Sequence, residues 1–137
     1  SSVARAMAWF ASAAQRSDRI SNAACTLVDA MRLHPELVAG EGRACTELMH
    51  AMDGKVAIKT GAEGVFIAIV PEKKIGIAVK VTDGARRGSE CAIAALLVAI
   101  GVLNPDHPAT KKRMNAPIIN WRGIETGFIR PAKDLTI

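Results

Sequence analysis

Aromatic side chains are scarce in this sequence of 137 residues: tyrosine is absent, and aromatic residues make up 4% of the chain. Alanine, methionine and the branched aliphatic residues must therefore fill the interior. Hydrophobic residues make up 50% and charged residues 23%, which excludes an intrinsically disordered chain. Glycine and proline are scattered without a period, which excludes collagen-like and low-complexity chains. The length suits a single domain.

Cysteine is also rare, with only Cys25, Cys45 and Cys91, and no Cys-x-x-Cys pair occurs. An odd number of widely spaced cysteines indicates neither a disulfide framework nor a zinc cage. We interpret them as thiols of a reducing compartment, with Cys91 in the core of an apolar helix. No apolar run is long enough for a membrane helix, and no signal peptide is visible. We therefore expect a cytoplasmic protein without a membrane partner.

The charge balance is modestly positive, with a formal net charge of +5. Such an excess favours solubility and loose attraction of anions more than any specific partner. The cationic run at residues 111–113 has no interleaved aromatic residues, so it predicts a solvated face and no nucleic-acid partner. Gly40-Glu41-Gly42 lacks the third glycine of a dinucleotide fingerprint and follows a predicted helix.

Hydrophobic periodicity predicts helices in the first and last thirds of the chain and strands between them. A first helix capped by Ser1 or Ser2 precedes a second over residues 20–31, which ends before Pro35. The other expected elements are a glycine-punctuated loop at 36–43, a short helix at 46–52, strands at 55–59, 65–70 and 75–81, an apolar helix from 89 or 90 to 103, and a last strand at 124–129. The pattern predicts an α+β fold, in which helices flank an antiparallel sheet of three to four strands.

The triplet Lys59-Thr60-Gly61 stands at the end of the first predicted strand. In serine hydrolases of the penicillin-recognising type, a Lys-Thr-Gly strand lines the active site opposite a nucleophilic serine. The lysine cation favours the serine alkoxide and holds a substrate carboxylate, while the glycine lets substrate approach the backbone. The alternative is a solvated strand-end lysine followed by an ordinary turn. Strand alternation places Lys59 on the same face as Ala57, partly desolvated between the sheet and a helix.

A longer series of motifs surrounds this triplet. It includes the strings HPELVAG at residues 34–40 and KTGAEG at 59–64, Gly42-Arg43, and the segments 65–66, 77–84, 87–90, 120–123 and 127–131. Over essentially the whole chain, this series resembles the C-terminal part of the bacterial L-asparaginase II family, the thermolabile or Rhizobium-type asparaginases. The resemblance implies a fold related to the serine β-lactamases and glutaminases. It also implies hydrolysis of L-asparagine to L-aspartate and ammonia through a serine acyl-enzyme, and a homo-oligomer, which we expect to be a dimer.

The family's nucleophile belongs to a Ser-x-x-Lys motif in its N-terminal part, and this sequence has no serine with a lysine three positions later. The family's upstream cysteine and lysine positions that can hold a metal are absent as well, so no cofactor or metal ligand is identifiable. Only Lys59 carries over as a catalytic residue, with Thr60 and Gly61 as substrate-binding positions. The chain also lacks an initiator methionine and enters helical periodicity at once. We therefore expect residues 1–137 to be the C-terminal portion of one longer domain.

Further candidates surround the glycine-rich loop. Arg43 can hold a substrate carboxylate as a bidentate fork, or it can brace the loop through a salt bridge. Glu63 can bind the substrate amine or pair with a basic neighbour. His34 can shuttle protons, although a helix C-cap is the simpler interpretation. Asp83, with Arg86 and Arg87, is expected to shape a surface turn.

Two other functions stay open. One is a small basic module that binds anions or nucleic acid through Arg86, Arg87 and the cations at 111–113. Binding to DNA that weakens steeply with added salt would favour it. The other is glutaminase or β-lactamase-like activity on the same scaffold.

Overall fold

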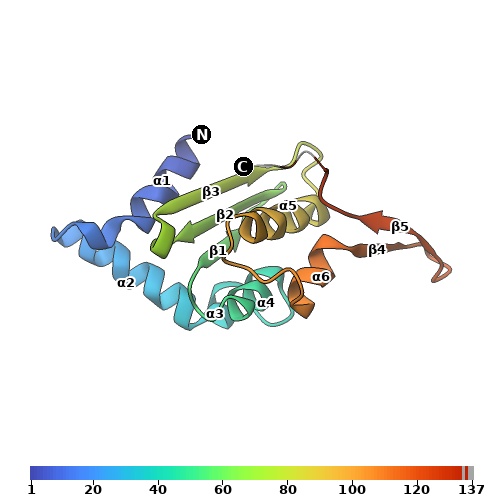
Figure 1. Cartoon of the computed structure of the whole chain (residues 1–137), viewed down its shortest axis with the longest axis horizontal. Coiled ribbons are helices and arrows are strands. Elements are labelled where there is room, and N and C mark those ends of the chain that lie inside the picture. Colours follow the sequence, from blue (N-terminus) through green and yellow to red (C-terminus); the bar gives the residue numbers. More distant parts are fainter. Residues whose placement is uncertain (134, 136–137) are drawn as a thin grey trace.

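The computed structural model describes residues 1–133 and 135 and shows an α+β arrangement, as predicted (Figure 1). The helices are α1 (Ser2–Ala11), α2 (Arg19–Leu33), α3 (Pro35–Ala39), α4 (Ala44–Ala51), α5 (Arg86–Ala99) and α6 (Pro108–Met114), with 3-10 turns η1 (Ala13–Gln15) and η2 (Pro71–Lys73). The strands are β1 (Ala57–Thr60), β2 (Val65–Val70), β3 (Ile75–Lys80), β4 (Ala116–Ile119) and β5 (Glu125–Ile129).

The main sheet is antiparallel with the order β1-β2-β3. The middle strand β2 is the almost continuously apolar run VFIAIV, and both of its faces are covered by helices, as the sequence predicts. Phe66 and Ala68 face the larger core, whereas Ile69 faces a smaller one. A strand that is buried on both faces needs no polar alternation, which explains the run.

The larger core joins the sheet to α4 and α5. Its fully buried side chains include Leu48 and Met49 from α4, Ile93 and Leu97 from α5, and Phe66 from β2. The smaller core lies on the opposite face of the sheet, where Ala11 of α1 and Val28 of α2 pack on Ala57 and Ile69. The sheet is therefore the central layer of the domain, between two groups of helices.

The first two helices both begin at side-chain caps; the cap of α1 at Ser1 was predicted, whereas that of α2 was not. The Ser1 hydroxyl accepts a hydrogen bond from the Ala4 amide at 3.3 Å. Asp18 caps α2, because its Oδ1 accepts hydrogen bonds from the Ile20 and Ser21 amides, each at 3.0 Å. These side chains satisfy amides that have no partner within their own helix.

Several boundaries differ from the sequence prediction. Pro35 does end α2 at Leu33, but it also opens α3 within the expected loop, because its fixed φ suits the first turn of a helix. Helix α5 begins at Arg86 rather than at residue 89 or 90, and it ends at Ala99, followed by Gly101 at a φ of +73°. Helix α6 was not predicted, because its sequence PATKKRM carries too little apolar periodicity.

The last predicted strand is present as β5, but it does not join the main sheet. It pairs with β4, which the sequence did not indicate, in a separate two-stranded sheet. The hairpin projects from the body of the domain (Figure 1). The expected sheet of three to four strands is therefore a three-stranded sheet plus a hairpin arm.

The longest helix of the described residues, α2, has 15 residues. Nowhere in residues 1–133 and 135 does a helix combine the length and the apolar character needed to cross a bilayer.

Candidate active site

Lys59 lies at the end of β1, next to Ile67 of β2 in the strand register. Ala57 packs into the smaller core and Ile58 into the larger one, so alternation places Lys59 on the α1–α2 face of the sheet. Its side chain is half-buried, and its Nζ donates a hydrogen bond to the Thr60 carbonyl at 2.8 Å. The predicted face and partial desolvation are both confirmed.

The outer edge of β1 is covered by sulfur atoms from α4. The Thr60 amide donates to the Cys45 Sγ at 3.2 Å, and the Ile58 amide donates to the Met49 Sδ at 3.5 Å. An edge strand otherwise presents free amides to other chains. These two donors on the outer edge of β1 are therefore occupied within the chain.

Cys45 is the residue that the sequence analysis missed at this site. Burial raises the pKa of its thiol, while the Thr60 amide and the charges of Lys59 and Arg43 oppose that rise. The structure therefore places Cys45 against Thr60, within the electrostatic influence of Lys59 and Arg43. The sequence did not indicate that Cys45 contacts Thr60, because Cys45 lies on α4 and Thr60 on β1. An isolated cysteine is usually a core residue.

Gly61 opens the tight turn between β1 and β2. Its amide donates to the Val65 carbonyl at 2.8 Å. A β-carbon at position 61 would lie 3.2 Å from the Val65 β-carbon, closer than side chains normally approach. The missing side chain of Gly61 therefore makes room for Val65.

Glu63 lies on the far side of the same turn, with an exposed side chain and a φ of +55°. Its backbone carbonyl accepts a hydrogen bond from the Lys80 Nζ. The next residue, Gly64, packs on Gly84, since a β-carbon at Gly64 would lie 3.1 Å from the Gly84 backbone. The basic neighbour of Glu63 thus contacts its backbone, and Lys80 and Gly84 brace the turn that follows Lys59.

Arg43 and His34 border the segment between α2 and α4. Arg43 is exposed at the N-cap position of α4. The loop-bracing salt bridge is not formed, because no carboxylate of residues 1–133 or 135 pairs with Arg43. His34 occupies the C-cap of α2, where its amide donates to the Ala30 carbonyl, and its Nδ1 lies 3.6 Å from the Glu36 Oε1. The C-cap interpretation is confirmed.

The cations at residues 111–113 lie on α6 and are paired. Lys111 lies 3.0 Å from Asp106, and Lys112 lies 2.6 Å from Glu47. The Arg113 Nη2 contacts the other Glu47 oxygen at 2.6 Å, and its Nε lies 3.3 Å from Glu90 without hydrogen-bond geometry. Arg113 is only 10% exposed, so the prediction of a fully solvated run was wrong for this residue.

The turn after β3 is organised by its own charges. Asp83 accepts a hydrogen bond from the Ala85 amide at 2.8 Å and pairs with Arg87 at 3.3 Å. These contacts hold the turn that precedes α5, whose N-cap residue is Ala85. They confirm that Asp83 and Arg87 shape a surface turn.

An open apolar cavity of about 260 Å³ lies on the Lys59 face of the sheet. Its walls come from α1, α2 and β2, and its lining residues are Met7, Phe10, Leu27, Val28, Met31, Ile67 and Ile69. Lys59 itself does not line the cavity, although Ile67, its register partner, does.

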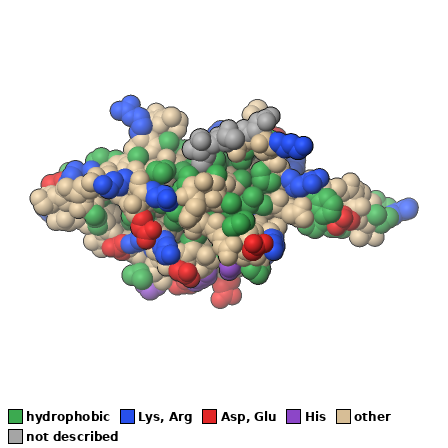
Figure 2. All heavy atoms as spheres, in the orientation of Figure 1, with side chains coloured by type: hydrophobic (Ala, Val, Ile, Leu, Met, Phe, Trp, Pro, Cys, Tyr) green, Lys and Arg blue, Asp and Glu red, His purple; other side chains and the backbone are tan. Residues whose placement is uncertain are grey.

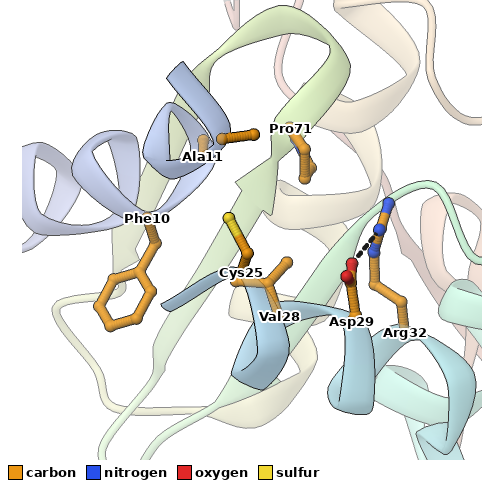
Figure 3. Close-up of a pocket in the computed structure, with 8 residues that line it drawn as sticks. Phe10, Ala11, Cys25, Val28, Asp29, Arg32 and Pro71 are labelled. Carbon is orange, nitrogen blue, oxygen red and sulfur yellow. Dashed lines mark hydrogen bonds and ion pairs between the residues drawn. The ribbon is translucent and has the colours of Figure 1, made fainter. Parts of the chain in front are cut away.

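A second cavity, of about 220 Å³, lies between α1, α2 and Pro71 (Figure 3). Figure 3 shows the Cys25 side chain and the Asp29–Arg32 ion pair, all from α2, along its wall. None of the predicted site residues lines this cavity.

The described part of the chain contains no group of three or more His, Cys, Asp or Glu side chains placed to hold a metal ion.

Helices on both faces of an antiparallel sheet, with a Lys-Thr-Gly triplet at a strand end, define an α+β domain. The family model described as L-asparaginase II matches residues 1–131, and the chain belongs to this family. Among curated proteins, none matches this sequence.

Proposed function

We propose that residues 1–137 form the C-terminal portion of an L-asparaginase that hydrolyses L-asparagine to L-aspartate and ammonia. The observation that carries the proposal is the half-buried Lys59 at the end of β1, in a chain of the L-asparaginase II family. On this proposal the scaffold is related to the serine β-lactamases and glutaminases, the protein acts in the cytoplasm, and the active enzyme is a dimer.

The reaction on this proposal uses a serine from outside these residues, because none of the six serines here has a lysine three positions later. The serine oxygen attacks the side-chain amide carbon of asparagine, the carbon–nitrogen bond breaks, and ammonia leaves with the serine proton. Water then attacks the acyl ester, which releases aspartate and returns a proton to the serine. No step needs a further reactant.

Lys59 supplies positive charge to this site. A cation beside the serine favours its alkoxide, and the same charge attracts the substrate carboxylate. Arg43 is the second cation near Cys45, so it is the next candidate for holding a carboxylate as a fork. Thr60 and Gly61 bind substrate at the strand end that carries Lys59, and Glu63 meets the substrate amine through its exposed side chain.

The experiment compares ammonia release by the 137-residue chain with release by a longer parent polypeptide that includes the Ser-x-x-Lys segment. We expect none above buffer from the 137 residues and clear activity from the parent, with asparagine preferred over glutamine and over a β-lactam. Ammonia release by the 137 residues that a serine-directed inhibitor abolishes would contradict the proposal. An inactive parent would contradict it as well.

The alternative of a basic binding module has little support in the structure. Three of its proposed cations, Lys111, Lys112 and Arg113, are paired with carboxylates, and so is Arg87. Paired cations release few counterions from a nucleic acid. A titration with duplex DNA at low and moderate salt tests this alternative directly.

A further inference from the structure

The cavity between α1, α2 and Pro71 is separate from the candidate active site, because no residue of β1 or α4 lines it (Figure 3). Its apolar lining includes Phe10 and Ala11 of α1 and Val28 of α2. An apolar cavity of about 150 Å³ takes up benzene. A cavity of about 220 Å³ therefore admits one aromatic ring with a small substituent.

Three side chains of α2 give this cavity polar groups. Cys25, Asp29 and Arg32 line it, and their spacing of four and three residues places them on one face of the helix. Figure 3 shows the Cys25 sulfur pointing toward α1, with the Asp29 and Arg32 side chains on the same side of α2. Asp29 is exposed, whereas Cys25 and Arg32 are half-buried. The cavity therefore opens to solvent beside Asp29. The space-filling view places cations and carboxylates over the helical surface around it (Figure 2).

The Arg32 guanidinium offers the cavity an unused hydrogen-bond donor. Its Nη2 donates to the Asp29 Oδ1, whereas its Nε is buried and has no hydrogen-bond partner in residues 1–133 and 135. A buried donor without an acceptor raises the free energy of the folded chain. A ligand that accepts a hydrogen bond from Nε removes this cost. The cavity therefore favours a ligand with an acceptor over a purely apolar one.

The Asp29 carboxylate determines which acceptor is suitable. Asp29 already neutralises Arg32, and its own negative charge opposes the entry of an anion. A carboxylate can accept several hydrogen bonds, and a primary amide carries one carbonyl acceptor and two N–H donors. The carbonyl oxygen of such an amide can accept from the Arg32 Nε while its nitrogen donates to Asp29. A neutral primary amide thus complements both members of the pair.

We propose that this cavity binds a neutral aromatic primary amide, with its ring against Phe10 and Val28 and its amide group on the Asp29–Arg32 pair. An aromatic ring suits the wall because it can pack against the Phe10 ring. Asparagine has the same amide group, but its ammonium and carboxylate charges would lose water against apolar walls. The cavity is therefore not a second site for that amino acid, and the inference does not depend on the proposed activity.

The experiment uses Cys25 as a reporter of occupancy, because a ligand in the cavity covers its thiol. A chromogenic disulfide reagent modifies the native 137-residue chain in the presence of benzamide, benzoate, toluene or asparagine. At about ten times its dissociation constant, benzamide should slow the reaction of Cys25 about tenfold, because only the empty cavity exposes the thiol. At the same concentration the other three compounds should slow it about threefold or less, because each loses hydrogen bonds to the pair or brings an unfavourable charge. Benzamide should not slow the reaction of the denatured chain.

Two substitutions test the polar pair. Arg32→Met keeps the apolar stem and removes the donors, so protection by benzamide should be lost. Arg19→Met is the matched control, because Arg19 is exposed at the start of the same helix, and protection should be unchanged. Asp29→Asn removes the negative charge and leaves Arg32 unneutralised, so benzoate should now protect Cys25 as well as benzamide does. A misfolded chain would not gain a ligand in this way.

Several results would overturn the proposal. Absence of protection by benzamide would show that the cavity does not bind this class of ligand. Equal protection by toluene would show that the cavity selects a ring alone, and equal protection by benzoate in the wild type would show that Asp29 does not select against anions. Protection by benzamide that persists in Arg32→Met, or an Asp29→Asn variant that benzoate does not protect, would also contradict it.

Discussion

Gly76 in β3 lies against the backbone of Ala8 in α1. A β-carbon added at Gly76 would stand 2.0 Å from the Ala8 nitrogen and 2.4 Å from the Ala4 carbonyl oxygen. Such distances cannot be relieved by rotating a side chain, because both atoms belong to the helix backbone. The close contact of α1 with the main sheet therefore depends on a glycine at this position.

Gly76→Ala should destabilise the chain by about 3 kcal/mol, in the upper range for overpacking, because α1 must move off the sheet. Chemical denaturation followed by circular dichroism measures the change. Gly127→Ala is the control, since a β-carbon there would lie 3.9 Å from Ile118, an ordinary contact. Equal stability of Gly76→Ala and wild type would show that α1 does not pack on β3 as described.

Arg113 joins three helices by contacting Glu47 of α4 and Glu90 of α5 from α6. Arg113→Met leaves the partly buried Glu90 without its cation and Glu47 with Lys112 alone, so we expect a loss of roughly 3 kcal/mol in unfolding free energy. Lys111→Met removes the same charge from an exposed pair with Asp106 and should cost less than about 1 kcal/mol. Similar losses in the two variants would contradict the structural role of Arg113.

Asp18 makes the stability of the chain depend on pH. Hydrogen bonds from the Ser21 hydroxyl and amide hold the pKa of its carboxyl below the ordinary value. The charged carboxylate therefore stabilises the folded state above the unfolded-state pKa, and this contribution is lost as pH falls through the folded-state pKa. Asp18→Asn should be less stable than wild type at neutral pH, and the difference should shrink below about pH 4. Thermal unfolding of both proteins from neutral to acidic pH checks this, and a constant difference would rule it out.

The three cysteines should differ in reactivity. Cys45 and Cys91 are buried, and burial raises the pKa of both thiols, so little thiolate is present at neutral pH. Cys25 is partly exposed. A chromogenic disulfide reagent should therefore titrate one thiol rapidly in the native chain and all three after denaturation, and Cys25→Ser should abolish the rapid phase. Rapid reaction of Cys45 would show that the α4–β1 contact opens readily.

Lys59→Met in the complete enzyme should lower asparagine turnover by roughly 100-fold or more, the scale expected for losing a positioned electrostatic group. Folding should survive, because methionine keeps the apolar stem of the lysine. Lys55→Met is the control, because Lys55 is exposed and precedes β1. Near-normal turnover of Lys59→Met would show that Lys59 is an ordinary strand-end residue.

Individual helices and strands could be predicted from the sequence, because the residue patterns that indicate them lie within single segments. Pro35 ends α2, the run VFIAIV forms the covered central strand β2, and alternation placed Lys59 and Ala57 on one face. Each of these rests on the geometry of a single segment. The strings around Lys59 also indicated the family.

Only the tertiary structure decided which segments meet. It placed Cys45 of α4 against Thr60, filled the space beside Gly61 with Val65, and paired the α6 cations with Glu47 and Glu90. It also separated β5 from the main sheet. Contacts of this kind join residues far apart in the chain, and their free energy depends on burial and on charges that no single segment contains. The sequence determined the strand that carries Lys59, and the packing of α1, α2 and α4 around that strand determined what surrounds it.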